Sequence, residues 1–310
     1  MSDLALSVGD LRVSPRRRRR ESTMKWIFFA AAATSVVITL LIVASLVGEA
    51  WAFVNSADFE WASLNEIGWF PRRGLFDIST LIVGSLIVTV IAMLVAWPLG
   101  VGAAIYLSEY ARPRVRRVLK PILEILAGIP SVVLGFFALT VISPDLVQQI
   151  FVDAPQFNLL TAGLGVGILT IPLVASVSED ALRSVPNTMR EASEGLGARK
   201  MTTTVKVVIP AAVSGLVAAG IIGVSRAIGE TMVVAIAAGA SGGSLFTTSP
   251  TDPGQTMTAA MASLATGTDQ VRGASNAFQS LFFVGLVLFV ITLLLNIVSE
   301  RFVARVRQRY

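Results

Sequence analysis

Cysteine and histidine are both absent from the 310 residues of this chain. Without cysteine there are no disulfides and no thiolate metal sites, and without histidine there is no histidine-ligated haem. Charged residues are scarce as well: they make up 15% of the chain, whereas a soluble domain carries about 25%. No nucleophile–base constellation is visible, so an enzyme is the least favoured class.

Hydrophobic residues make up 54% of the chain, and the mean hydropathy is +0.73. They are grouped in runs of about 20 residues, the length that crosses a hydrocarbon core of about 30 Å as a helix. We therefore expect an all-α, polytopic membrane protein with six transmembrane helices. The expected spans are 26–47, within 78–106, 122–142, 159–178, 211–238 and 278–299.

The first apolar run has 22 residues, longer than the roughly 7–15 residues of a signal peptide, so we interpret it as an anchor. In the second span Pro98 predicts a kink, and Gly84, Gly100 and Gly102 allow close packing. In the third span Gly128-Ile129-Pro130 predicts a break, which is either a packing kink or part of a pathway.

The glycines of the fourth span, Gly163, Gly165 and Gly167, are expected to be packing positions, because the Lys-Ser/Thr of a phosphate-binding loop does not follow them. The loop 48–77 contains Trp51, Trp61 and Trp69, whose rings suit a membrane interface. The apolar stretch 257–264 is too short to span, so we expect it to lie at the interface or to re-enter.

Lys and Arg are distributed unequally between the two sides of the expected spans. The N-terminal tail has 7, the loops after the second and fourth spans have 5 each, and the C-terminal tail has 4, whereas the opposite loops have 3 in total. Because positive residues stay on the cytoplasmic side, both termini are expected in the cytoplasm. We therefore interpret the run Arg16–Arg20 as a cytoplasmic topology anchor. The same distribution explains the basic pI, so nucleic-acid binding is not needed to explain it.

The loop after the fourth span, about 179–210, is long and charged. Pro186-Asn187 can begin a helix with Asn187 as N-cap, and residues 188–196 continue it. Gly197 stands where a left-handed residue would end that helix. A second helical run from Ala198 leads to Pro210 and into the fifth span, so the segment could transmit a push into the membrane.

This loop carries a resemblance to a known family. Glu191-Ala192-Ser193, Gly197 and Val207-Val208-Ile209-Pro210 are similar to the EAA pattern of ABC importer permeases, with Ser193 in place of the second Ala and Val207 in place of Ile. The resemblance implies a MetI-like fold in which a helix over this stretch inserts into a groove of a separate ATPase subunit. It assigns Glu191, Ala192, Ser193, Gly197 and Pro210 to coupling. The chain itself has no P-loop.

The fifth span contains two charges, Arg226 and Glu230. An arginine at mid-bilayer costs about 2.5–3.5 kcal/mol on insertion scales, and Glu230 one turn further can pair with it. Gly215, Ala219 and Gly223 continue the same helix face and allow another helix to approach. The pair is either a structural ion pair or a site at which Arg226 attracts an oxyanion, since a guanidinium suits phosphate oxygens.

Three stretches together resemble the PstC family of phosphate importer permeases: 105–111 (IYLSEYA), 127–139 (AGIPSVVLGFFAL) and 226–232 (RAIGETM). The likeness covers about residues 65–300. It implies that Arg226, Glu230 and Thr231 lie on the substrate pathway. Residues 1–25 would then form a basic cytoplasmic tail, and residues 26–310 a permease domain in the cytoplasmic membrane.

This resemblance implies import of inorganic phosphate with several partners. They are a PstA-like second permease, two copies of a PstB-like ATPase that holds ATP and Mg²⁺, and an extracytoplasmic PstS-like phosphate-binding protein. No cofactor, metal or nucleic acid is expected in this chain, only membrane lipid around it. Alternatives remain: a permease for sulfate or molybdate, an ion-coupled secondary transporter, or a membrane scaffold or sensor.

Overall fold

The computed structural model describes residues 15–56, 64, 67–239, 243–266 and 276–306. The chain divides into two compact units, Met1–Glu49 and Ala50–Tyr310. The first unit consists of most of helix α1 (Pro15–Val54). The run of arginines is therefore helical and continuous with the apolar segment. Thr34 and Thr39 donate their hydroxyls to the carbonyls of Ala30 and Ser35, which satisfies two polar side chains inside this apolar helix.

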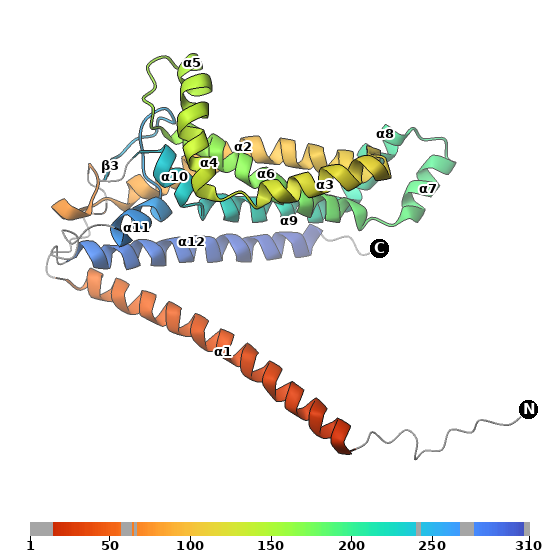
Figure 1. The fold of residues 1–310 in the computed structure, drawn as a ribbon, viewed down its shortest axis with the longest axis horizontal. Coiled ribbons are helices and arrows are strands. Elements are labelled where there is room, and N and C mark those ends of the chain that lie inside the picture. The colour runs from red at the N-terminus through yellow and green to blue at the C-terminus, as the bar shows by residue number, and fades with distance from the viewer. Residues whose placement is uncertain (1–14, 57–63, 65–66, 240–242, 267–275, 307–310) are drawn as a thin grey trace, which may run out of the picture. The chain divides into compact units, whose positions relative to one another are not determined.

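The second unit contains the remaining elements, which are mostly helical (Figure 1). Its α-helices are α2 (Ile78–Ile105), α3 (Pro113–Ala127), α4 (Ser131–Phe137), α5 (Gln148–Ile150), α6 (Leu159–Arg183), α7 (Asn187–Gly195), α8 (Lys200–Thr203), α9 (Ile209–Ile228), α10 (Met232–Ala237), α11 (Met257–Ala265) and α12 (Ala277–Val306). Wider π-helical turns join some of them, over Tyr106–Tyr110, Ala138–Val147 and Thr204–Val208. A short 3₁₀ turn covers Pro71–Arg73. The strands are β1 (Gly68–Phe70), β2 (Leu75–Phe76) and β3 (Ser244–Leu245).

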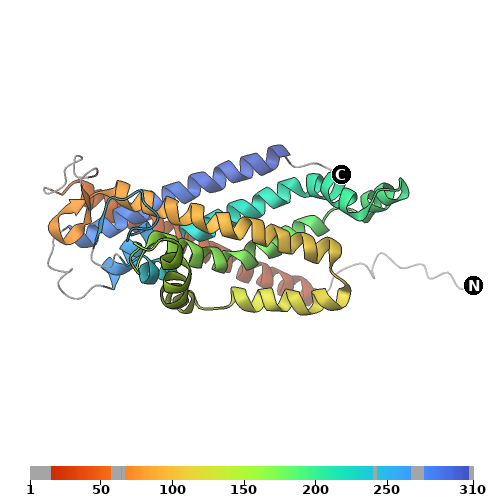
Figure 2. The same cartoon turned by 90° about the horizontal axis from the view of Figure 1, so that it is seen from above.

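Helices α2, α6 and α9 pack lengthwise and form the centre of this unit (Figures 1 and 2). Small residues permit the close approach: Gly163 of α6 faces the side chain of Ile91, and Gly167 faces the backbone of Ala92 on α2. The glycines of the fourth span are therefore packing positions, as predicted. Gly84 and Gly100 also lie in close contacts, whereas Gly102 has open space where a side chain would be and makes no close contact within this chain.

The predicted break at Gly128-Ile129-Pro130 is confirmed, because α3 ends at Ala127 and α4 begins at Ser131. Pro130 has no N–H that could continue the hydrogen bonding of α3. Its carbonyl accepts from the Val133 N–H in the first turn of α4. Beyond the break, the helical segment from α4 to α5 crosses the direction of α2, α6 and α9 (Figure 1). It continues to Ile150, eight residues past the expected end.

The expected fifth span is not one continuous helix. Its helical run begins at Lys200, before Ala211, and α9 ends at Ile228, with α10 beginning only at Met232. Gly229, Glu230 and Thr231 form the interruption. Glycine is a poor helix residue, and the contacts described below satisfy the backbone groups that the break releases.

At one end of the unit the three strands form a small antiparallel sheet in the order β2-β1-β3. Trp69 on β1 is buried with Phe53, Phe76 and Met257. Its predicted place at a membrane interface is therefore wrong, whereas Trp51 is exposed and Trp61 lies outside the described residues. The stretch expected at an interface or re-entering is α11, which packs against α12, α10 and α2.

Within the described residues, six helical segments are long and apolar enough to cross a membrane. They are Arg20–Val54, Ile78–Tyr110, Ser131–Ile150, Leu159–Arg183, Lys200–Ile228 and Ala277–Arg301. Their number agrees with the sequence prediction. Segment ends differ because tertiary contacts, rather than the apolar run alone, decide where each helix stops.

Two glycines of α2 allow a matched test of this packing. A Cβ on Gly84 would lie 2.5 Å from the backbone oxygen of Gln255, whereas a Cβ on Gly102 would meet nothing within 4 Å. We expect Gly84→Ala to cost about 1–3 kcal/mol of unfolding free energy, because backbone cannot easily move aside. Gly102→Ala should be neutral or stabilise by about 0.5–1 kcal/mol. Thermal unfolding of the two variants in detergent measures both, and equal stabilities would contradict the packing.

Candidate functional site

The predicted charged pair is formed at the break between α9 and α10. The Nη1 atom of Arg226 lies 2.8 Å from Oε2 of Glu230. The two side chains differ in exposure, because 45% of Arg226 is exposed and only 4% of Glu230. A guanidinium has five N–H donors, so the exposed part of Arg226 can bind a further acceptor while Glu230 holds the side chain in place.

Neighbouring groups satisfy the backbone at this break. The Glu230 N–H donates to the carbonyl of Ala227, and the Glu230 carbonyl accepts from the hydroxyl of Thr258 at 2.7 Å. Thr258 belongs to α11 and is itself buried. The short helix α11 therefore fixes the position of Glu230, and through it the position of Arg226.

Thr231, the third predicted pathway residue, is half-buried and stands just before α10. Its hydroxyl reaches the carbonyl of Gly229 at 3.4 Å, and its own carbonyl accepts from Ala235. Arg226, Glu230 and Thr231 are thus gathered around one interruption of the helix. In membrane transporters, discontinuous helices of this kind often form the substrate site.

The face of α9 below the pair packs closely, as its small residues predict. A side chain on Gly215 would collide with Ala181 of α6, and one on Gly223 would meet Val174 of α6 and Met93 of α2. Ala219 is fully buried. This face therefore packs α9 against α6 and α2. The side chain of Arg226, in contrast, is exposed.

The predicted coupling residues lie on α7 and in the turn after it, except for Pro210, which lies near the start of α9. Glu191 and Ala192 are exposed on α7, where a partner could reach them. Gly197 follows α7 with φ of +80°, which confirms the left-handed residue, whereas Asn187 is the first residue of the helix rather than its cap. Ser193 is bonded to Thr203 of α8, with 2.9 Å between the two hydroxyl oxygens.

Pro210 lies in the first turn of α9, directly after the π-helical turn Thr204–Val208. A wider turn accommodates the missing N–H of proline without interrupting the helix. The helical run from Lys200 to Ile228 has 29 residues, so it is roughly 40 Å long at about 1.5 Å per residue. The structure does not bring the two predicted sets of residues together; this run connects them.

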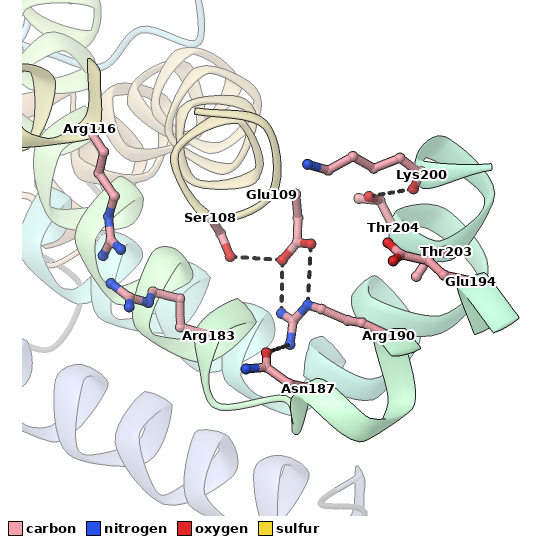
Figure 3. A pocket seen from close by; sticks show the side chains of 10 residues that line it. All are labelled: Ser108, Glu109, Arg116, Arg183, Asn187, Arg190, Glu194, Lys200, Thr203 and Thr204. Atoms are coloured by element: carbon pink, nitrogen blue, oxygen red, sulfur yellow. Dashed lines mark hydrogen bonds and ion pairs between the residues drawn. The ribbon is translucent and has the colours of Figure 1, made fainter. Parts of the chain in front are cut away.

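Arg190 and Glu109, which sequence reasoning did not single out, fasten α7 to the central helices (Figure 3). The guanidinium of Arg190 donates to both carboxylate oxygens of Glu109, at 2.9 and 3.3 Å, and to the carbonyls of Leu182 and Val185. The Glu109 side chain is 6% exposed and that of Arg190 18%. Arg190 therefore ties α7 to the π-helical turn Tyr106–Tyr110, which continues α2, and to the end of α6.

A second charge cluster surrounds Glu179, whose side chain is 2% exposed. Three cations share this carboxylate: Arg116 forms a short hydrogen bond, Lys120 lies at 3.5 Å and Arg183 at 3.8 Å. Arg116 and Lys120 belong to α3, so the cluster ties α3 to α6. Arg183 lies one turn along α6 from Glu179, a local spacing, whereas Arg116 and Lys120 are far from Glu179 in the sequence and no local pattern predicts them.

Family comparison agrees with these features. Residues 96–310 match the family described as "Binding-protein-dependent transport system inner membrane component". The six apolar helical segments of the described residues agree with a membrane-spanning component. The match covers more than half of the chain, so the chain belongs to this family of inner-membrane transport components.

Several relatives are similar over most of their length. A probable ABC transporter permease, YqgH of Bacillus subtilis, is 34% identical over 74% of each chain. The phosphate transport system permease PstC 1 of Mycobacterium tuberculosis is 34% identical, over 76% of this chain and 75% of its own. PstC of Mesorhizobium japonicum is 31% identical, over 86% of this chain and 85% of its own.

Solved structures share the fold. A bacterial ABC transporter involved in alginate import matches with a TM-score of 0.62 at 15% identity, over 92% of this chain and 99% of its own. The MetNI methionine ABC transporter matches with a TM-score of 0.54 at 19% identity, over 74% of this chain and 94% of its own. These likenesses place the unit among MetI-like permease folds, as expected from the sequence.

The Arg190–Glu109 pair can be tested by a single and a double substitution. Arg190→Ala should cost about 3–5 kcal/mol of unfolding free energy, because it leaves a buried carboxylate without its cation. Glu109→Gln in the same protein should recover part of this loss, since the amide carries no charge. Thermal unfolding in detergent is the measurement, and Arg114→Ala, an exposed arginine of α3, is the control. If Arg190→Ala were as stable as the control, the pair would not fasten α7.

Proposed function

We propose that this chain is the permease subunit of an ATP-driven importer that passes inorganic phosphate across the cytoplasmic membrane. One observation carries the proposal: a half-exposed arginine, Arg226, is held by a buried carboxylate at a break in a membrane-spanning helix. The relatives named as phosphate transport permeases support the choice of substrate.

Phosphate suits this site for a chemical reason. The guanidinium fork of Arg226 matches two oxygens of a tetrahedral oxyanion. Glu230, which lies beside it, repels the same anion and so keeps binding weak enough for release. Thr231 adds a hydroxyl at the break. The same geometry could receive sulfate or molybdate, which is the second candidate function.

The remaining subunits are part of the proposal. A PstA-like permease would complete the pathway, a PstS-like protein would deliver phosphate from outside, and a dimer of PstB-like ATPases would hold ATP and Mg²⁺. No cofactor would reside in this chain, which is not itself an ATPase. The basic ends of the spans, and with them both termini and α7, would lie in the cytoplasm.

Coupling would follow from the connection between α7 and α9. When ATP closes the ATPase dimer, a push on Glu191 and Ala192 would pass through the Gly197 turn into the run that ends at Arg226. Because Arg190 ties α7 to α2 and α6, these helices would move with it. The pathway would then open alternately to the two sides of the membrane.

ATP-dependent uptake of labelled phosphate by the subunits reconstituted in liposomes tests this function. Arg226→Ala should reduce uptake roughly 10- to 100-fold, because it removes charge-assisted hydrogen bonds of about 1.5–3 kcal/mol. Ser225→Ala, on the same turn of α9, is the matched control and should retain uptake.

Two results would count against parts of the proposal. Unchanged uptake in an assembled Arg226→Ala transporter would reduce Arg226 to a packing role. An assembled complex that hydrolyses ATP without taking up phosphate, but takes up sulfate or molybdate, would replace phosphate by another oxyanion.

Two glycines of the coupling segment provide a further test. Gly197 has φ of +80°, whereas Gly195 is an ordinary helical residue, and neither would meet an atom within 4 Å if it gained a Cβ. Gly197→Ala should therefore strain only the backbone, by roughly 1–2 kcal/mol, and lower the phosphate transported per ATP hydrolysed. Gly195→Ala should leave this ratio unchanged, and the same ratio in both variants would contradict a role for the turn in coupling.

A further inference from the structure

Helix α3 (Pro113–Ala127) is attached to the rest of its unit over a small surface. None of its 15 residues is buried, although it runs alongside α6 (Figures 1 and 2). Arg116, Leu119, Lys120 and Leu123 share the face towards α6, since they recur at helical spacing, and each of them stays partly exposed. Apolar burial therefore contributes little to holding α3 in place.

The remaining apolar residues of α3 do not attach it to α6 either. Val118, Ile122 and Ile125 lie on the other faces of the helix and are exposed. Lipid or another subunit can cover these side chains, but a cover on the outside does not join α3 to α6.

Both ends of α3 are non-helical joints. Before it, Ala111 and Arg112 are extended, with ψ of 131° and 151°, and the ring of Pro113 disfavours helical backbone at Arg112. After it, the chain is interrupted between Gly128 and Pro130, where Pro130 has ψ of 133°. A few residues of this kind can absorb changes of φ and ψ, so α3 can move sideways without unwinding α2 or α4.

The charge cluster around Glu179 is therefore the main connection between α3 and α6. Helix α3 contributes two of its three cations, Arg116 and Lys120. Helix α6 contributes the buried carboxylate and also Arg183, which approaches the same carboxylate oxygen as Arg116 (Figure 3). Without the carboxylate, the two cations of α3 would face the cation of α6, and like charges repel. One carboxylate thus decides whether the two helices attract or repel each other.

We propose that Glu179 is a latch: it holds α3 against α6, and loss of its contacts with Arg116 and Lys120 lets α3 swing away about the joints at its two ends. The side chains of Arg116 and Lys120 are partly exposed, so they can exchange the carboxylate for water without first unpacking. Glu179 is buried and stays with α6 in both positions of α3.

Movement of α3 would reach the Arg226 site through α4 and α10. Helix α3 continues through the break into α4, and Gly135 of α4 packs closely on Val233 and Ile236 of α10. Helix α10 begins directly after Thr231. The following consequence rests on the proposed function, whereas the latch itself does not. During transport, release of α3 would shift α4 and α10 and so change the surroundings of Arg226.

Distances measured by pulsed EPR on the full chain in nanodiscs test the latch. The chain has no cysteine, so Val118→Cys on α3 and Ser184→Cys after α6, both exposed positions, carry its only spin labels. We expect a single distance in this background. Glu179→Gln should add a longer distance and make it the more populated of the two, because three cations lose their carboxylate. Glu124→Gln, the same change at an exposed position of α3, is the control and should keep the original distance.

A second variant keeps the test decisive if Glu179→Gln does not fold. Arg116→Gln/Lys120→Gln removes the α3 half of the latch and leaves Glu179 beside Arg183, and it should also add the longer distance. The original distance alone, in both variants or in the one that folds, would overturn the latch.

Release during transport is tested with the same two labels in the assembled transporter. A non-hydrolysable ATP analogue should produce the longer distance in the protein that keeps Glu179. A distance that stays unchanged, in a complex that takes up phosphate with ATP, would overturn release during transport and would leave the phosphate function standing.

Discussion

The ion pair between Arg226 and Glu230 is the interaction on which the rest of this account depends. An arginine in a membrane-spanning helix is tolerated only with a partner, and here the partner lies in the interruption that follows the helix. The break itself needs a support, which Thr258 of α11 supplies by bonding the Glu230 carbonyl. Helix α11 is in turn held by its packing on α12 and α2. The position of the exposed Arg226 side chain therefore depends on α11 and on the helices that hold α11.

At the opposite end of the bundle, two sets of ion pairs hold helices together. Arg190 fastens α7 to α2 and α6, and Glu179 fastens α3 to α6. Each carboxylate is buried and bound to arginine, so both connections are costly to break. Helix α7 is thus fixed to the helices behind it, and the chain continues from it through Gly197 into the run Lys200–Ile228.

The sequence predicted the features that depend on neighbouring residues. The Arg226–Glu230 pair follows from a spacing of four, the left-handed Gly197 from its place after a helical pattern, and the break at Gly128–Pro130 from proline chemistry. Six apolar segments were counted correctly for the same reason. Membership of the importer permease family was also recognised from motifs and is supported by the family match.

Features that depend on distant residues were missed. The break at Gly229 was not predicted, because glycine is common in membrane helices and the deciding contact comes from Thr258. Arg190 and Glu109 are 81 residues apart, so no local pattern reveals them. Trp69 was assigned to an interface, whereas pairing of β1 with β3 and packing against Phe76 bury it. The assignment of Arg226, Thr231 and Glu191 to roles in transport remains a prediction.

Cysteine chemistry offers the most direct test of the central claim, that the break beside Arg226 borders an aqueous path for phosphate. This chain has no cysteine, so a single introduced thiol is the only one in this subunit, and its labelling is read from this subunit after the transporter is separated. In the assembled transporter, Thr231→Cys should react with a charged thiol reagent, since only a hydrated thiol ionises readily. Phosphate should slow that reaction, while Leu94→Cys, an exposed position on α2 expected to face lipid, should stay unreactive. If Thr231→Cys is not labelled, or if phosphate does not slow its labelling, the break beside Arg226 does not border an aqueous path for phosphate.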